Sequence, residues 1–196
     1  MYEKFGQFID GKWSPSSNNE TYEVINPATE EVLGHASKAT PADVDRALKS
    51  AEQGLQIWKK TPPWQRSYVL RKIADKLREK KDTLAKWMTL ENGKPLAEGV
   101  GETNGAADIF EWNAEETKRI FGQTIESRFE DTRVHVYYQP VGVVAALSPW
   151  NFPLILAARK ISTALAAGCS VIIKPDTITP GVVMELVDIC RECGVP

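Results

Sequence analysis

Apolar residues recur at helical spacing through the first half of the chain. They fall three or four positions apart over residues 44–58, 70–77 and 84–90, which is typical of helices that bury one face. We expect three helices here, and a fourth from about residue 96 to 121 with Gly122 as its end. The first half of the molecule is therefore predicted to be mainly helical.

Short stretches before these helices alternate between apolar and polar residues. Residues 7–9 and 12–13 flank Asp10–Gly11, a pair typical of a tight hairpin turn. Residues 22–25 alternate in the same way, and residues 32–36 can pair with them. Two small hairpins are predicted on the N-terminal side of the helices.

The pattern changes after residue 122. Residues 123–127 and 133–139 predict two strands around a charged turn. Pro140 interrupts the second one, which favours an edge or an extended arm over a central strand. A continuous apolar run covers residues 141–147 and is typical of a strand that is buried on both faces.

Strands and helices alternate over the remaining residues. The apolar run at 141–147 is followed by a predicted helix over 152–167, a strand over 171–173 and a helix over 180–193. This order is a βαβα unit, which opens a doubly wound parallel sheet. The fold class predicted from the pattern is therefore α/β.

The carboxyl ends of the two predicted parallel strands are the expected place for a ligand. Pro149 ends the first strand and Pro153 suits the first turn of the next helix, so Asn151 is held at their junction. Spacing allows two interpretations of Asn151. Its side chain caps the helix, or its amide donates a hydrogen bond to a developing oxyanion.

Composition narrows the classes of function. The formal net charge is -2, which gives no indication of a nucleic-acid or anionic-membrane partner. No apolar run reaches the roughly 18 residues of a membrane helix, and residues 1–8 lack the apolar stretch of a signal peptide. Three cysteines do not indicate a disulfide framework, so we expect a reduced, cytoplasmic protein.

Two motifs are weighed against simpler explanations. Cys190 and Cys193 form a Cys-x-x-Cys pair, but no second ligand pair accompanies them, so we expect no metal site. Gly99, Gly101 and Gly105 resemble part of a phosphate loop, but no strand precedes them. Neither motif is expected to carry chemistry.

Several motifs together resemble the aldehyde dehydrogenase superfamily. The Pro-Trp-Asn-Phe-Pro run at residues 149–153 follows a buried strand, and residues 166–175 read Ala-Ala-Gly-Cys-Ser-Val-Ile-Ile-Lys-Pro. Earlier matching runs are Asp10–Trp13, Asn26–Thr29 and Glu91–Pro95. The resemblance covers essentially the whole chain in the right order, and the stretches 91–102 and 111–119 are similar to the succinate-semialdehyde dehydrogenase branch.

The resemblance implies roles for the residues at the strand ends. Asn151 would donate to the oxyanion that forms when the family's cysteine attacks an aldehyde. Lys174 would bind the adenosine ribose of NAD or NADP. NAD-preferring members carry a glutamate where this chain has Thr177, and since threonine does not repel a 2′-phosphate, NADP is expected to be tolerated. The remaining residues predicted to line the coenzyme site are Ser148, Pro149, Trp150, Pro175 and Asp176.

Two basic residues follow in the next helix. Lys160 falls where the family commonly has a lysine, and it is a further catalytic candidate. Arg159 resembles the arginine of the succinate-semialdehyde branch that holds the substrate carboxylate, and a guanidinium suits a carboxylate bidentately. The alternative for both is a solvated basic pair.

The resemblance also implies how the chain is organised. Residues 1–121 would supply short strands and helices of the coenzyme domain, residues 122–140 a β-hairpin oligomerisation arm, and residues 141–196 the first part of the Rossmann-like NAD(P)-binding domain. This is an incomplete aldehyde dehydrogenase fold, because the family's nucleophilic cysteine, general-base glutamate and catalytic domain are expected downstream. We therefore expect a homo-oligomer acting on an aldehyde, and no activity from these 196 residues alone. The alternative is a non-catalytic module that only folds and associates.

Overall fold

The computed structural model describes residues 2–196, which form six helices and eight short strands. The elements, in chain order, are β1 (Gln7–Ile9), β2 (Lys12–Ser14), β3 (Thr21–Ile25), β4 (Val32–Ser37), α1 (Pro41–Trp58), α2 (Pro63–Glu79), α3 (Lys81–Asn92), α4 (Leu96–Thr117), β5 (Gln123–Glu126), β6 (Arg133–Val136), β7 (Val143–Leu147), α5 (Pro153–Ala166), β8 (Ser170–Lys174) and α6 (Gly181–Cys193).

The strand pairings follow the predicted order. The pairs β1–β2, β3–β4 and β5–β6 are antiparallel hairpins, whereas β7 and β8 are parallel. In the parallel pair Val143 lies opposite Ser170 and Leu147 opposite Lys174, so both strands end at the same level. The predicted βαβα unit is confirmed.

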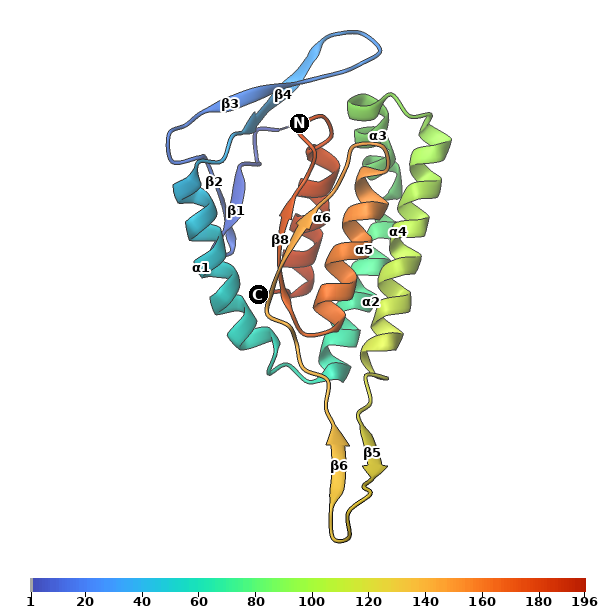
Figure 1. Cartoon of the computed structure of the whole chain (residues 1–196). Coiled ribbons are helices and arrows are strands. Elements are labelled where there is room, and N and C mark those ends of the chain that lie inside the picture. The colour runs from blue at the N-terminus through green and yellow to red at the C-terminus, as the bar shows by residue number, and fades with distance from the viewer. Residues whose placement is uncertain (1) are drawn as a thin grey trace.

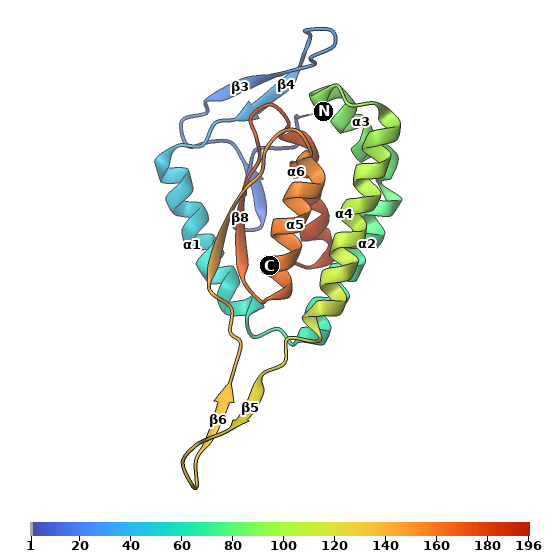
Figure 2. The ribbon, with the colours of Figure 1, turned by 45° about the vertical axis from the view of Figure 1, so that its right-hand side comes forward.

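The elements form layers around the parallel pair. Helix α1 packs against β7 and β8 from one side and α5 from the other, while α2, α3 and α4 lie beyond α5 and α6 (Figures 1 and 2). The β5–β6 hairpin extends away from this body as a thin arm, and β7 and β8 run away from the arm (Figure 1). The carboxyl ends of the parallel strands therefore lie at the end of the molecule opposite the arm.

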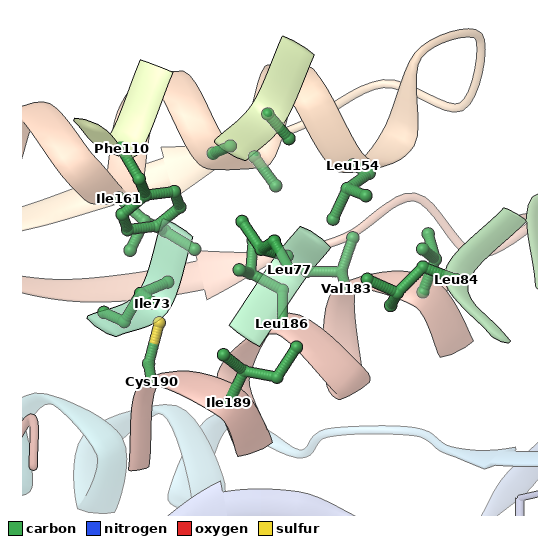
Figure 3. Close-up of a cluster of buried hydrophobic side chains, with 14 of the residues drawn as sticks. Ile73, Leu77, Leu84, Phe110, Leu154, Ile161, Val183, Leu186, Ile189 and Cys190 are labelled. Atoms are coloured by element: carbon green, nitrogen blue, oxygen red, sulfur yellow. The ribbon is translucent and has the colours of Figure 1, made fainter. Parts of the chain in front are cut away.

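The hydrophobic core joins the N-terminal helices to the βαβα unit. Most of its buried side chains come from α2 to α6, and those labelled in Figure 3 point toward one another. Burying each large apolar side chain contributes about 1.5–3 kcal/mol, so this shared core is the main force that holds the layers together. The residues labelled in Figure 3 are Ile73, Leu77, Leu84, Phe110, Leu154, Ile161, Val183, Leu186, Ile189 and Cys190.

Local signals set some of the helix ends. Thr40 and Asp43 form a reciprocal capping box at the start of α1, and Gly93 ends α3 in the left-handed conformation with φ 76°. Helix α4 ends at Thr117 rather than near residue 121. Ile120 and Phe121 are exposed, so nothing packs on a further helical turn, and the predicted end was wrong by about one turn.

The prediction that β7 is buried on both faces is also wrong. Within residues 2–196, β7 pairs only with β8, and only Ala146 of the strand is fully buried. Leu147 keeps 65% of its surface exposed. The described residues therefore leave part of this apolar strand uncovered. No helix within residues 2–196 is long and apolar enough to cross a membrane.

Candidate functional site

The two predicted site segments lie side by side at the carboxyl ends of β7 and β8. The Ser148 N–H continues the ladder by donating to the Lys174 carbonyl at 3.2 Å. Ser148 is buried, whereas Pro149, Trp150 and Asn151 after it are exposed. The sequence therefore placed these residues correctly at one edge of the sheet.

The start of α5 is capped by a residue from another helix. Phe152 occupies the N-cap position and makes no side-chain cap. Instead, one carboxylate oxygen of Glu102 in α4 accepts the N–H groups of Leu154 at 2.9 Å and Ile155 at 3.1 Å. The interpretation of Asn151 as the helix cap is wrong, because those amides bond to Glu102.

The turn that carries Asn151 is held by the α3–α4 connection. Lys94 forms a buried ion pair with Glu102 and also donates to the Asn151 carbonyl at 3.2 Å. The Lys94 ammonium lies 4.2 Å from the ring centroid of Phe152. Asn92 donates to the Trp150 carbonyl at 3.0 Å. The backbone of this turn is thus held from outside, and the Asn151 side chain is exposed.

At the end of β8, the predicted coenzyme residues differ in exposure and in hydrogen bonding. Lys174 is exposed, and its ammonium donates to the Pro175 carbonyl at 3.0 Å. Asp176 accepts the Ile178 N–H at 3.1 Å, and its charge, after burial and Glu91, contributes to raising the pKa of Tyr22 to about 12. The Asp176 carboxylate is therefore engaged within its own loop, whereas Thr177 is exposed.

The start of α6 is also capped from a distance. Glu91 at the end of α3 accepts the N–H groups of Gly181 at 2.7 Å and Val182 at 3.3 Å, together with the Tyr2 hydroxyl. Burial raises the pKa of Glu91 to about 7. A side chain at Gly181 would place its Cβ 2.2 Å from the Trp87 ring, so this close approach requires glycine.

Arg159 and Lys160 lie within α5, whereas Asn151 lies in the turn before this helix. Both line an open hollow of about 430 Å³ beside β7. Lys160 donates back to the Leu156 carbonyl at 3.4 Å, while within residues 2–196 the Arg159 guanidinium forms no ion pair. The remaining lining residues are Val141, Val144, Ala145, Ala146, Thr163, Ala164, Ala167 and Cys169.

Comparison with known proteins assigns the family. Residues 13–196 match the model of the aldehyde dehydrogenase family. The chain belongs to the aldehyde dehydrogenase family. Its α/β fold is that of the N-terminal part of aldehyde dehydrogenase structures, as predicted.

Semialdehyde dehydrogenases are among the relatives of this aldehyde dehydrogenase chain. A glutarate-semialdehyde dehydrogenase of Pseudomonas putida is 43% identical over 96% of the chain. The NADP(+) succinate-semialdehyde dehydrogenase of Escherichia coli is 42% identical over the same share. The crystal structure of succinate-semialdehyde dehydrogenase from Burkholderia pseudomallei superposes with a TM-score of 0.94 at 39% identity and also matches 96% of the chain. In each case the chain spans 39% of the relative's length.

The motifs that were set aside lie in helices of this aldehyde dehydrogenase chain. Gly99, Gly101 and Gly105 are inside α4, where Gly99 packs against Ala85 of α3. Cys190 and Cys193 are buried in α6, and burial raises the pKa of both thiols. Their surroundings are those of packing residues.

Sequence reasoning missed the residues that support the site. Glu91 and Lys94 were noted as part of a family-like motif and Glu102 only as the end of a similar stretch, with no role assigned. A usable signal was present, because the helices after β7 and β8 both begin without a Ser, Thr, Asp or Asn at the N-cap. Such helix starts require an acceptor from elsewhere in the fold.

The strand ends fit the polar part of a nicotinamide coenzyme. The Ser148 and Thr179 hydroxyls are buried with no hydrogen-bond partner in the described part of the chain. Lys174 supplies a cationic donor and Thr177 an exposed hydroxyl on the same edge. This donor set suits ribose hydroxyls and phosphate oxygens, which combine hydrogen-bonding capacity with negative charge.

Proposed function

We propose that the protein that contains this chain is an NAD(P)-dependent aldehyde dehydrogenase that oxidises a carboxylate-bearing semialdehyde, such as succinate semialdehyde, to the acid. The observation that carries the proposal is the exposed side chain of Asn151, which lies after β7 at the carboxyl ends of the parallel strands. The helix that follows, α5, is capped by Glu102 and not by Asn151. Its amide can donate to an oxyanion without giving up a structural role.

The other residues of the edge would bind and orient. Lys174 and Thr177 would hold the adenosine ribose, with Ser148, Pro149, Trp150 and the backbone around Pro175 and Asp176 lining the same site. A bound nicotinamide supplies the hydride acceptor. Arg159 would pair with the distal carboxylate of the substrate, and Lys160 beside it adds positive charge.

The experiment that tests the function is a turnover assay on the full-length protein. We expect NAD(P)H absorbance to increase with succinate semialdehyde and an acid product to accumulate. The 196-residue chain alone is expected to be inactive. A full-length protein that folds but turns over no aldehyde would support the alternative, a module that folds and associates without catalysis.

Coenzyme choice should depend on Thr177. In the full-length enzyme, Thr177→Glu is expected to lower kcat/KM for NADP by roughly fivefold relative to NAD, because two exposed charges about 4 Å apart repel by about 1 kcal/mol in water. Steady-state kinetics with both coenzymes measure the ratio, with Thr83→Glu at an exposed position of α3 as control. An unchanged ratio would mean that Thr177 does not determine coenzyme choice, and Asp176 would be the next residue to substitute.

The arm should mediate self-association. The β5–β6 hairpin extends from the body and carries apolar side chains that are 44–76% exposed, including Ile125, Phe129, Val134 and Tyr137. Exposed strand edges with apolar side chains associate readily. We expect the chain to form oligomers by light scattering, and Ile125→Lys with Val134→Lys to shift it toward the monomer. A wild-type monomer at all concentrations would contradict an oligomerisation role.

A further inference from the structure

Glu102 and Lys94 form a nearly solvent-free ion pair directly beneath the Asn151 turn. Their side chains are 2% and 6% exposed. Burying two charges costs desolvation energy that the pairing repays only in part, so such a pair is weak evidence for a stabilising role. The pair instead positions the turn, because both partners form hydrogen bonds with the backbone around Asn151.

The bonds fix the turn on both sides of Asn151. Ahead of it, Asn92 holds the Trp150 carbonyl at 3.0 Å. At the residue itself, Lys94 holds the carbonyl at 3.2 Å. After it, Glu102 holds the amides of Leu154 and Ile155 at 2.9 and 3.1 Å. All of these contacts are to backbone atoms of the turn.

Holding the backbone while leaving the side chain exposed is what an oxyanion donor requires. A preorganised donor stabilises charge only if it already points at the place where the charge develops. Small displacements of such a group reduce the rate even when the change is made elsewhere. The turn also has no capping residue of its own that could fix it locally.

We propose that Lys94 and Glu102, assisted by Asn92, are positioning residues that set the orientation of the Asn151 amide for catalysis. The proposal rests on the proposed function. Its structural part, that these three residues hold the backbone of residues 150–155, stands on the hydrogen bonds alone.

A double-mutant cycle in the full-length enzyme tests the catalytic part. Glu102→Gln keeps the shape of the side chain and removes its charge. We expect kcat to fall about tenfold through displacement of the donor, while KM for the coenzyme stays within about twofold of the parent value, a change that corresponds to about 0.4 kcal/mol. In an Asn151→Ala background the same change should have no further effect, because there is no amide left to misplace.

The matched control is Glu115→Gln. Glu115 lies on the same helix and pairs with Arg71 on the outer surface, so it should leave kcat unchanged. An equal loss of kcat from Glu102→Gln in both backgrounds would show a general structural role and overturn the proposal. If Glu102→Gln does not fold, Asn92→Ala removes a single partly exposed hydrogen bond and should show a smaller loss with the same dependence on Asn151.

Hydrogen exchange separates failure of this proposal from failure of the proposed function. Backbone amides in residues 150–156 should exchange faster in Glu102→Gln than in the parent, with or without catalytic activity. Unchanged exchange there would overturn the positioning role. Faster exchange in an enzyme without aldehyde oxidation would retain the positioning role and reject the proposed function.

Discussion

Replacing Asn151 by alanine in the full-length enzyme should lower kcat by about 10²–10³-fold, the range observed when one oxyanion-hole donor is removed. The amide is exposed at the end of β7 in a turn held by Glu102, Lys94 and Asn92, so its loss should leave the fold intact. Since the donor acts when charge develops, KM should change far less than kcat.

Steady-state kinetics at saturating coenzyme measure this effect. Asn104→Ala, at an exposed position of α4, is a suitable control with the same change in side chain. The melting temperature of Asn151→Ala should match that of the parent. A loss of kcat accompanied by a large fall in melting temperature would mean that Asn151 is structural, and an unchanged kcat would remove it from the catalytic site.

Arg159→Met should lower kcat/KM for succinate semialdehyde by roughly ten- to a hundredfold, which corresponds to losing a charge-assisted bidentate hydrogen bond. Arg159 lines the hollow beside β7, and its guanidinium forms no ion pair within residues 2–196. A neutral aldehyde of similar length makes no such bond. Its kcat/KM should therefore be nearly unchanged.

The control for the arginine substitution is Arg191→Met. Arg191 is an exposed residue on α6 that pairs with Asp188 of the same helix, so both substrates should be unaffected by its loss. Equal losses on the acidic and the neutral substrate in Arg159→Met would show that Arg159 is structural. The assignment to carboxylate-bearing substrates would then be wrong.

The sequence predicted the elements well where local chemistry decides them. The helix starts and ends with their own signals were placed closely, as at Thr40 and Gly93, because the capping groups are neighbours in the chain. The end of α4 was misplaced, because tertiary packing stops before Gly122. The parallel pair was found from its apolar runs, but the exposure of Leu147 was not, since burial depends on what surrounds a strand.

The candidate site was predicted only in its outer part. The sequence located Ser148–Asn151 and Lys174–Thr177, because ligands bind at the carboxyl ends of parallel strands and this rule depends only on topology. The supporting residues could not be found in this way. Glu102 precedes Leu154 by 52 residues, and Glu91 precedes Gly181 by 90. Nothing in local periodicity connects such pairs, although helix starts without capping residues indicate that a distant acceptor is needed.

The two remote caps have a consequence for recombining this fold with others. The helices of the βαβα unit take their N-terminal acceptors from α3 and α4, so a graft of residues 141–196 onto another scaffold would leave four backbone N–H groups without partners. The part of the protein left behind would keep the carboxylates of Glu91 and Glu102 without these backbone partners. The βαβα unit is continuous in sequence but is not structurally independent. A chimaera must therefore exchange α3, α4 and the βαβα unit together.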